Sequence, residues 1–317
     1  MDQPSALRVI AVYLLIVFIA GAFLAPRLHS SIQFVAEPHL RARRMLGPIY
    51  EHLRSFSETL AREPFYRFVN RCLLIVAIVG LPHFFKSLRM RSVSAVGLKG
   101  DPRHWGEMLQ GLCWGFAALA LAAAMTVSFH ARVFNFTHSP TEWGKHIQGA
   151  AAAAAVVAII EEILFRGALF GALRRDHGFR TAALVSSSIY AVLHFFEQPP
   201  DPAQIHWYSG LVVLGQMLRG FTELQTLIPG FFNLLLIGLL LCLAYERTGA
   251  LLFSIGLHAG FVFWVKLFGF MTLDISGANS WIFGSNRLVD GWSTALLLIP
   301  MLLLFRQILP KKKTDDQ

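Results

Sequence analysis

The sequence predicts an all-α membrane protein, a polytopic bundle of about eight transmembrane helices. Of its 317 residues 55% are hydrophobic and only 15% are charged, whereas soluble domains carry about 25% charged residues. The mean hydropathy is +0.53, and apolar runs long enough to cross a bilayer recur along the chain. We therefore exclude a large soluble core. We expect an integral, multi-pass protein, located in the plasma membrane if the source is bacterial.

Eight apolar runs account for the expected helices, each of about 17–27 residues. They cover residues 7–25, 69–86, 107–129, 147–173, 181–197, 228–246, 250–270 and 291–308. Pro82 and His83 interrupt the second run, which is the weakest. The segment 207–222 is too short and too rich in glycine for a span, so we interpret it as a re-entrant or interfacial piece.

Between the first two spans, residues 26–68 are polar and rich in arginine. Apolar residues recur there at helical spacing, which predicts that part of the segment lies on the membrane surface. They are Leu46, Ile49, Tyr50 and Leu53. We divide the chain into N-terminal helices with this amphipathic loop (1–106), a central core (107–271), and a last helix with a basic tail (272–317).

The net charge of +9 does not indicate nucleic-acid binding, because the basic residues gather in short loops between apolar runs. The expected partner is the lipid bilayer. If the tail is cytoplasmic, eight crossings also place the N-terminus and the basic loops at 86–103 and 174–180 inside, as the positive-inside rule requires. The arginine-rich segment 26–68 then falls outside, against that rule.

The run 147–173 carries Glu161, Glu162 and Arg166 in an otherwise apolar stretch. Each ionisable group at membrane depth costs ~2.5–3.5 kcal/mol on insertion scales, so such groups are rarely there for packing. On a helix Glu162 and Arg166 are four residues apart and can pair. Glu161 is turned about 100° away and left free, which suits a reacting base. The alternative is a structural ion pair that holds a transporter bundle together.

Two later runs contain histidines. Tyr190 and His194 are four residues apart and share a helix face, and His258 stands among small residues. Glu161 and His194 each lie ~20 Å from the basic loop between their helices, and His258 lies ~16 Å from Arg247, at about 1.5 Å per residue. If Arg247 is on the same side, the three groups meet at one level of the membrane.

A glutamate and a histidine can position and deprotonate a water molecule, and a second histidine can donate to a developing oxyanion. This set predicts peptide hydrolysis without a serine or cysteine nucleophile, with Glu161, His194 and His258 as the catalytic residues. The same three side chains could ligate a divalent metal such as zinc. The chain shows no HExxH motif, so no zinc signature supports that alternative.

Three motifs carry a family resemblance. The segment 161–167 matches EExxxR, 190–194 matches aromatic-xxx-His, and 258–262 matches the start of an HxxxN motif. Over about 145–270 the chain resembles the CPBP family, which includes the type 2 CAAX prenyl proteases and the bacteriocin-processing and immunity (Abi) proteins. The family is often called a metalloprotease family, and its metal dependence is disputed.

The resemblance implies an intramembrane endopeptidase that acts on membrane-associated peptides or proteins. Glu161 and His194 would activate the water, and His258 would line the oxyanion site. Glu162 and Arg166 would hold the shape of the site, next to Tyr190 of the second motif.

One departure from the family pattern concerns the last motif. Val262 stands where the family usually has Asn or Asp, and its side chain neither donates nor accepts a hydrogen bond. This favours an alternative function as a non-proteolytic scaffold or immunity-type protein of the same fold. A proton-coupled transporter is a further alternative, although the sequence lacks the matching hydrophobic halves that transporters often show.

Overall fold

The computed structural model describes residues 5–37, 47–88, 97, 103–275 and 279–310. Helices dominate these residues, and their only sheet is one antiparallel pair of three-residue strands. The predicted all-α class is therefore confirmed. The chain separates into two compact units, one made of 1–87 with 195–221 and the other of 88–194 with 222–317. The sequence-based division at 106 and 271 stays a prediction.

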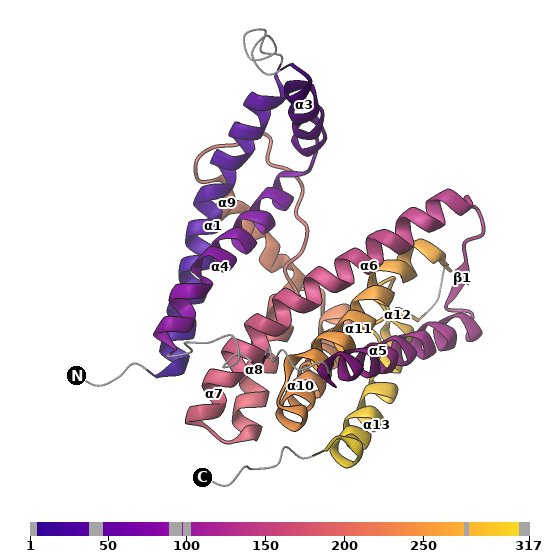
Figure 1. Ribbon diagram of the computed structural model, residues 1–317. Helices are drawn as coiled ribbons and strands as arrows, with labels where there is room; N and C mark the ends of the chain where they lie inside the picture. Colours follow the sequence, from indigo (N-terminus) through magenta and orange to yellow (C-terminus); the bar gives the residue numbers. More distant parts are fainter. Residues whose placement is uncertain (1–4, 38–46, 89–96, 98–102, 276–278, 311–317) are drawn as a thin grey trace. The chain divides into compact units, whose positions relative to one another are not determined.

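The first unit is built on two long helices, α1 (Ala6–Ala36) and α4 (Phe65–Ser87), with the short α9 (Ser209–Met217) and the 3₁₀ turn η3 (Leu218–Phe221) against them (Figure 1). Gly21 lets α1 approach α4 closely, because a Cβ there would lie 2.9 Å from the Cα atom of Leu73. Phe68, Cys72 and Met217 form part of the buried core.

The first helix is longer than predicted, because it continues past residue 25 to Ala36 with Pro26 inside it. The Ser30 hydroxyl donates to the Pro26 carbonyl at 2.9 Å, within the same helix. The predicted surface helix is α3 (Pro48–Ala61). It exposes Ile49 and Leu53, whereas Tyr50 is buried. Leu46 lies outside the described residues, and contact of α3 with the membrane surface stays a prediction.

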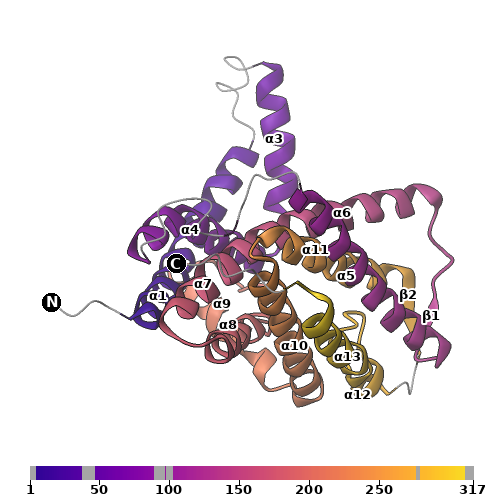
Figure 2. The ribbon, with the colours of Figure 1, turned by 60° about the horizontal axis from the view of Figure 1, so that its bottom comes forward.

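The second unit contains the remaining elements. In chain order they are α5 (Arg103–Ser128), β1 (Arg132–Phe134), α6 (Pro140–Glu162), the π-helix η2 (Ile163–Phe170), α7 (Gly171–Asp176), α8 (Phe179–Leu193), α10 (Leu224–Thr248), α11 (Leu251–Met271), β2 (Thr272–Asp274), α12 (Ser280–Phe283) and α13 (Trp292–Ile308). Helix α11 packs against both α5 and α6, and α10 packs against α8 and α13 (Figure 2). Helix α11 also packs against α10, so it joins the group of α5 and α6 to the group of α8, α10 and α13.

Glycines set the close contact between α5 and α11. A Cβ atom on Gly115 would lie 2.1 Å from the Leu257 carbonyl oxygen, and one on Gly256 would lie 1.9 Å from the Met108 carbonyl oxygen. Gly111 and Gly260 make equally close approaches, so each helix presents small residues four apart, the pattern that lets membrane helices touch. These contacts fix the part of α11 that carries His258.

Each of the eight apolar runs contains a helix, but their lengths differ. Among the described residues, α1, α4, α10, α11 and residues 105–128 of α5 are long and apolar enough to cross a membrane. Helices α8 and α13 are apolar but shorter, and the run 147–173 is divided among α6, η2 and α7. Helix α4 continues through Pro82, and the segment 207–222 forms only α9 and η3. The count of eight crossings and their sidedness stay predictions.

Candidate active site

The site lies where the α-helical part of the run 147–173 ends. Helix α6 stops at Glu162, and η2 continues the chain as a π-helix of eight residues that includes Arg166. π-Helical turns are rare and are frequent at functional sites. The sequence predicted one continuous helix here. Helical periodicity alone does not distinguish the wider π-helical turn, so this change was missed.

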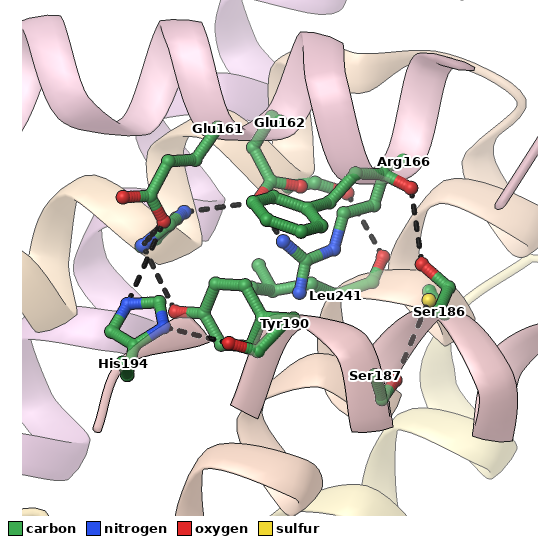
Figure 3. A network of polar contacts seen from close by, with 12 residues as sticks. Glu161, Glu162, Arg166, Ser186, Ser187, Tyr190, His194 and Leu241 are labelled. Atoms are coloured by element: carbon green, nitrogen blue, oxygen red, sulfur yellow. Dashed lines mark hydrogen bonds and ion pairs between the residues drawn. The ribbon is translucent and has the colours of Figure 1, made fainter. Parts of the chain in front are cut away.

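The inner part of the site is a buried cluster around Glu162, whose side chain, like that of Arg166, is fully buried. The Oε1 atom of Glu162 accepts from Arg166 Nη1 at 2.9 Å and from His258 Nδ1 at 2.8 Å. The guanidinium carbon of Arg166 lies 4.5 Å from the centroid of the Tyr190 ring, as Figure 3 shows. The ion pair expected from the four-residue spacing is thus present, and it also fixes the His258 ring.

The outer part of the site is formed by Glu161 and two imidazole nitrogens. Glu161 Oε2 lies 3.8 Å from His194 Nε2 and 3.7 Å from His258 Nε2. The side chains of Glu161 and His194 are 25% and 33% exposed, while that of His258 is 3% exposed. The three groups that the sequence placed at one level therefore come together, with Glu161 and His194 on the accessible side.

The end of α8 positions His194. The predicted run extended to residue 197, but α8 ends at Leu193 with His194 as its C-cap, whose backbone N–H bonds to the Ala191 carbonyl at 3.1 Å. The Tyr190 carbonyl, which would accept that N–H in a continued helix, instead lies 2.8 Å from His194 Nδ1. The helix end therefore turns the ring back and holds it beside Glu161.

These contacts assign the proton on each ring. A carbonyl oxygen only accepts, so His194 carries hydrogen on Nδ1. The carboxylate of Glu162 accepts from Arg166, and His258 therefore donates to it through Nδ1. In the neutral rings both Nε2 atoms are acceptors. Two nitrogen lone pairs and a carboxylate then surround one point, where a water molecule could donate its hydrogens. With hydrogen on Nδ1, His258 can donate through Nε2 only when the ring is protonated, and its expected place at the oxyanion site stays a prediction.

The donor atoms of this set, two imidazole nitrogens and a carboxylate oxygen, are those of many zinc sites. The described residues nevertheless form no group of three His, Cys, Asp or Glu side chains arranged to hold a metal ion. Zinc binding by Glu161, His194 and His258 therefore stays a prediction.

Residues 143–264 match a family model described as type II CAAX prenyl endopeptidase, Rce1-like. That range includes both glutamates, the arginine and both histidines of the site. It is a CPBP-family domain. Searches of curated proteins and of solved structures found no match. The family and the five long apolar helices among the described residues together identify an integral, multi-pass membrane protein.

The CPBP-family domain also contains polar contacts that sequence reasoning missed. The Ser186 hydroxyl donates to the Phe165 carbonyl at 3.1 Å, and the Ser187 hydroxyl lies 3.8 Å from the Cys242 sulfur (Figure 3). The signal was the run of three serines at 186–188, about one turn before Tyr190, on a helix otherwise rich in apolar residues. These contacts bind α8 to η2 and α10, and so hold Tyr190 in place.

Proposed function

We propose that the protein is an intramembrane endopeptidase that hydrolyses peptide bonds of membrane-associated substrates with an activated water molecule. One observation carries the proposal: His194 Nε2 and His258 Nε2 both lie within 3.8 Å of Glu161 Oε2, in a site where Glu161 and His194 are partly exposed. The CPBP-family match over 143–264 supports the same reaction class.

In the proposed reaction Glu161 and His194 hold the water and Glu161 takes one of its protons. The water oxygen attacks the peptide carbonyl carbon, and the proton then passes to the leaving amine as the C–N bond breaks. His258 borders the water from the buried side. Glu162 and Arg166 do not react in this scheme, because their contacts with each other and with His258 hold the ring in one orientation.

The substrate class to test first follows from the name of the matching family, CAAX prenyl endopeptidase. We propose a prenylated cysteine peptide ending in C-a-a-X, a membrane-anchored segment in which prenylation occurs on the cysteine. The same peptide without the prenyl group is the matched control for membrane association.

The test compares the wild-type protein in lipid vesicles with Glu161→Gln, which keeps shape and hydrogen bonding but removes basicity. We expect cleavage of the prenylated peptide to be abolished at unchanged protein level, and His194→Ala to act likewise. Glu246→Gln is the control, because Glu246 pairs with Arg174 at an exposed position. Comparing the membrane peptide profiles of cells that carry the wild-type protein or Glu161→Gln extends the test to unknown substrates.

Val262 favours one competing function. It follows His258 by one helical turn in α11 and brings no hydrogen-bonding group to that face. A non-proteolytic scaffold of the same fold would tolerate this substitution. Absence of cleavage by the wild-type protein, together with unchanged peptide profiles in both Glu161→Gln and His194→Ala at wild-type protein levels, would favour the scaffold and overturn the protease proposal. Zinc chemistry is tested in the same assay by chelation and zinc restoration.

A further inference from the structure

Hydrolysis of a peptide bond creates negative charge on the carbonyl oxygen, and this oxyanion requires hydrogen-bond donors. The groups around the water position do not supply them in their neutral form. Glu161 Oε2 accepts, and the Nε2 atoms of His194 and His258 are acceptors because each ring uses its hydrogen on Nδ1. The donor must come from another side chain of the site.

Three candidate donors of the described network are engaged or shielded (Figure 3). Arg166 donates from Nη1 to Glu162, whereas its Nε and Nη2 have no hydrogen-bond partner among the described residues. Its side chain is fully buried, and the guanidinium carbon lies over the rings of Phe165 and Tyr190, at 5.8 and 4.5 Å from their centroids, so these rings shield it. The Ser186 hydroxyl donates to a backbone carbonyl. The Ser187 hydroxyl faces the Cys242 sulfur.

Tyr190 is also buried, at 2% exposure, but its hydroxyl lies beside the Nε2 atom of His258 that borders the water position. The distance from this hydroxyl to His258 Nε2 is 3.4 Å, longer than a normal hydrogen bond from a hydroxyl, and a hydroxyl hydrogen can rotate toward a better acceptor. The ring is held firmly, because one face covers Arg166 and the Phe165 ring packs edge-on with centroids 5.2 Å apart. The O–H group is thus presented at a fixed place beside the reacting groups.

We propose that the Tyr190 hydroxyl is a catalytic hydrogen-bond donor to the oxyanion; this inference rests on the proposed peptide hydrolysis. When the water oxygen bonds to the carbonyl carbon, the C=O electron pair moves to oxygen and Glu161 receives the water proton. Tyr190 keeps its own proton throughout and shares it with the oxyanion. When the C–N bond breaks, the electron pair returns and the proton on Glu161 goes to the amine.

Tyr190→Phe tests the proposal, because it removes the hydroxyl and keeps the ring over Arg166. One oxyanion donor contributes ~10²–10³ in kcat, so we expect a fall of that size per folded molecule. KM, abundance and thermal unfolding should stay near wild type. Tyr245→Phe is the matched control, because Tyr245 is a tyrosine of the same unit that packs against Phe170 and not against the site.

Replacement of Tyr190 by para-aminophenylalanine restores an N–H donor at the same place and should recover most of the lost kcat. Wild-type kcat in Tyr190→Phe, a change confined to KM, or no recovery with the amino side chain would each overturn the proposal. The Glu161→Gln variant distinguishes a failure of the proposed hydrolysis from a failure of the proposed role of Tyr190. If this variant cleaves like wild type, the proposed hydrolysis by a Glu161-activated water fails. If it is inactive while Tyr190→Phe is fully active, only the role of Tyr190 fails.

Discussion

The two glutamates of the site are adjacent in sequence but have opposite surroundings. Glu162 is fully buried and one of its oxygens accepts from both Arg166 and His258. Glu161 is partly exposed, and its nearest ring nitrogens lie 3.7 and 3.8 Å away. The carboxylate of Glu162 is therefore held by fixed donors, whereas the carboxylate of Glu161 is open to a water molecule. This difference in burial supports the proposed division between Glu162 as a structural carboxylate and Glu161 as the reacting one.

This division predicts that Arg166→Ala acts on stability first. Removing the guanidinium leaves Glu162 as a buried charge without its cation, and breaking a buried pair costs about 3–5 kcal/mol. We expect lower abundance and a lower unfolding temperature in detergent. Arg174→Ala is the control, because Arg174 forms an exposed pair with Glu246, and such pairs contribute about 0–1 kcal/mol. Equal stability of the two variants would contradict the assigned role of Arg166.

At this scale, spacing predicted part of the site. The four-residue separation of Glu162 and Arg166, and the common depth of Glu161 with the two histidines, depend only on helical geometry. The bond from His258 to Glu162 and the place of the Tyr190 hydroxyl depend on how α8 and α11 pack against η2. No local pattern contains that information, so the tautomer of His258 and the donor of the site could not be predicted from the sequence.

At the scale of single elements, the packing of α5 on α11 determines where His258 lies. A methyl group on Gly256 would lie 1.9 Å from the Met108 carbonyl oxygen, which is backbone and cannot rotate aside. Gly256→Ala should therefore displace α11 and lower both stability, by about 1–3 kcal/mol as for overpacking, and cleavage. Gly149→Ala in α6 is the matched control, because a Cβ there meets no atom within 4 Å. Thermal unfolding and cleavage rates check this, and a harmless Gly256→Ala would contradict it.

Element boundaries were harder to predict than element existence. Apolar runs reveal helices, but a proline at 26 and a polar composition after it obscured the last part of α1. The shift from α-helix to π-helix at Ile163 leaves no trace in an apolar pattern, because the segment 163–170 is apolar at nearly every position.

At the scale of the whole molecule, sequence order did not predict how the elements group. Residues 195–221 follow the catalytic candidate His194 directly, yet they belong to the first unit with 1–87. There the Phe65 backbone N–H donates to Asp201 at 2.6 Å, and the Glu197 N–H donates to the Met217 carbonyl at 3.0 Å. Such pairs join positions far apart in sequence, and hydropathy gives no information about which distant segments meet.

The contacts inside the second unit support the predicted sidedness of its helices. Arg174 pairs with Glu246, and Arg247 donates to the Arg306 carbonyl at 2.9 Å, so the ends of α7, α10 and α13 gather at one end. Near the start of α10, Asn233 donates to the carbonyls of Val289 and Gly291. The loop before α13 therefore lies toward the opposite end, as alternate crossings of α10 and α13 require.

We therefore expect single cysteines at Asp176 and Thr314 to be labelled from one side of the membrane and a cysteine at Ser280 from the other. Thr314 lies outside the described residues, so its side is inferred from the end of α13. The native Cys72, Cys113 and Cys242 must first be replaced by serine, because Cys113 is exposed. A reagent that does not cross membranes, applied to sealed cells and then to inverted vesicles, gives the readout. Labelling of Ser280 and Thr314 positions from the same side would mean that α13 does not cross, which would rule out the eight-span topology.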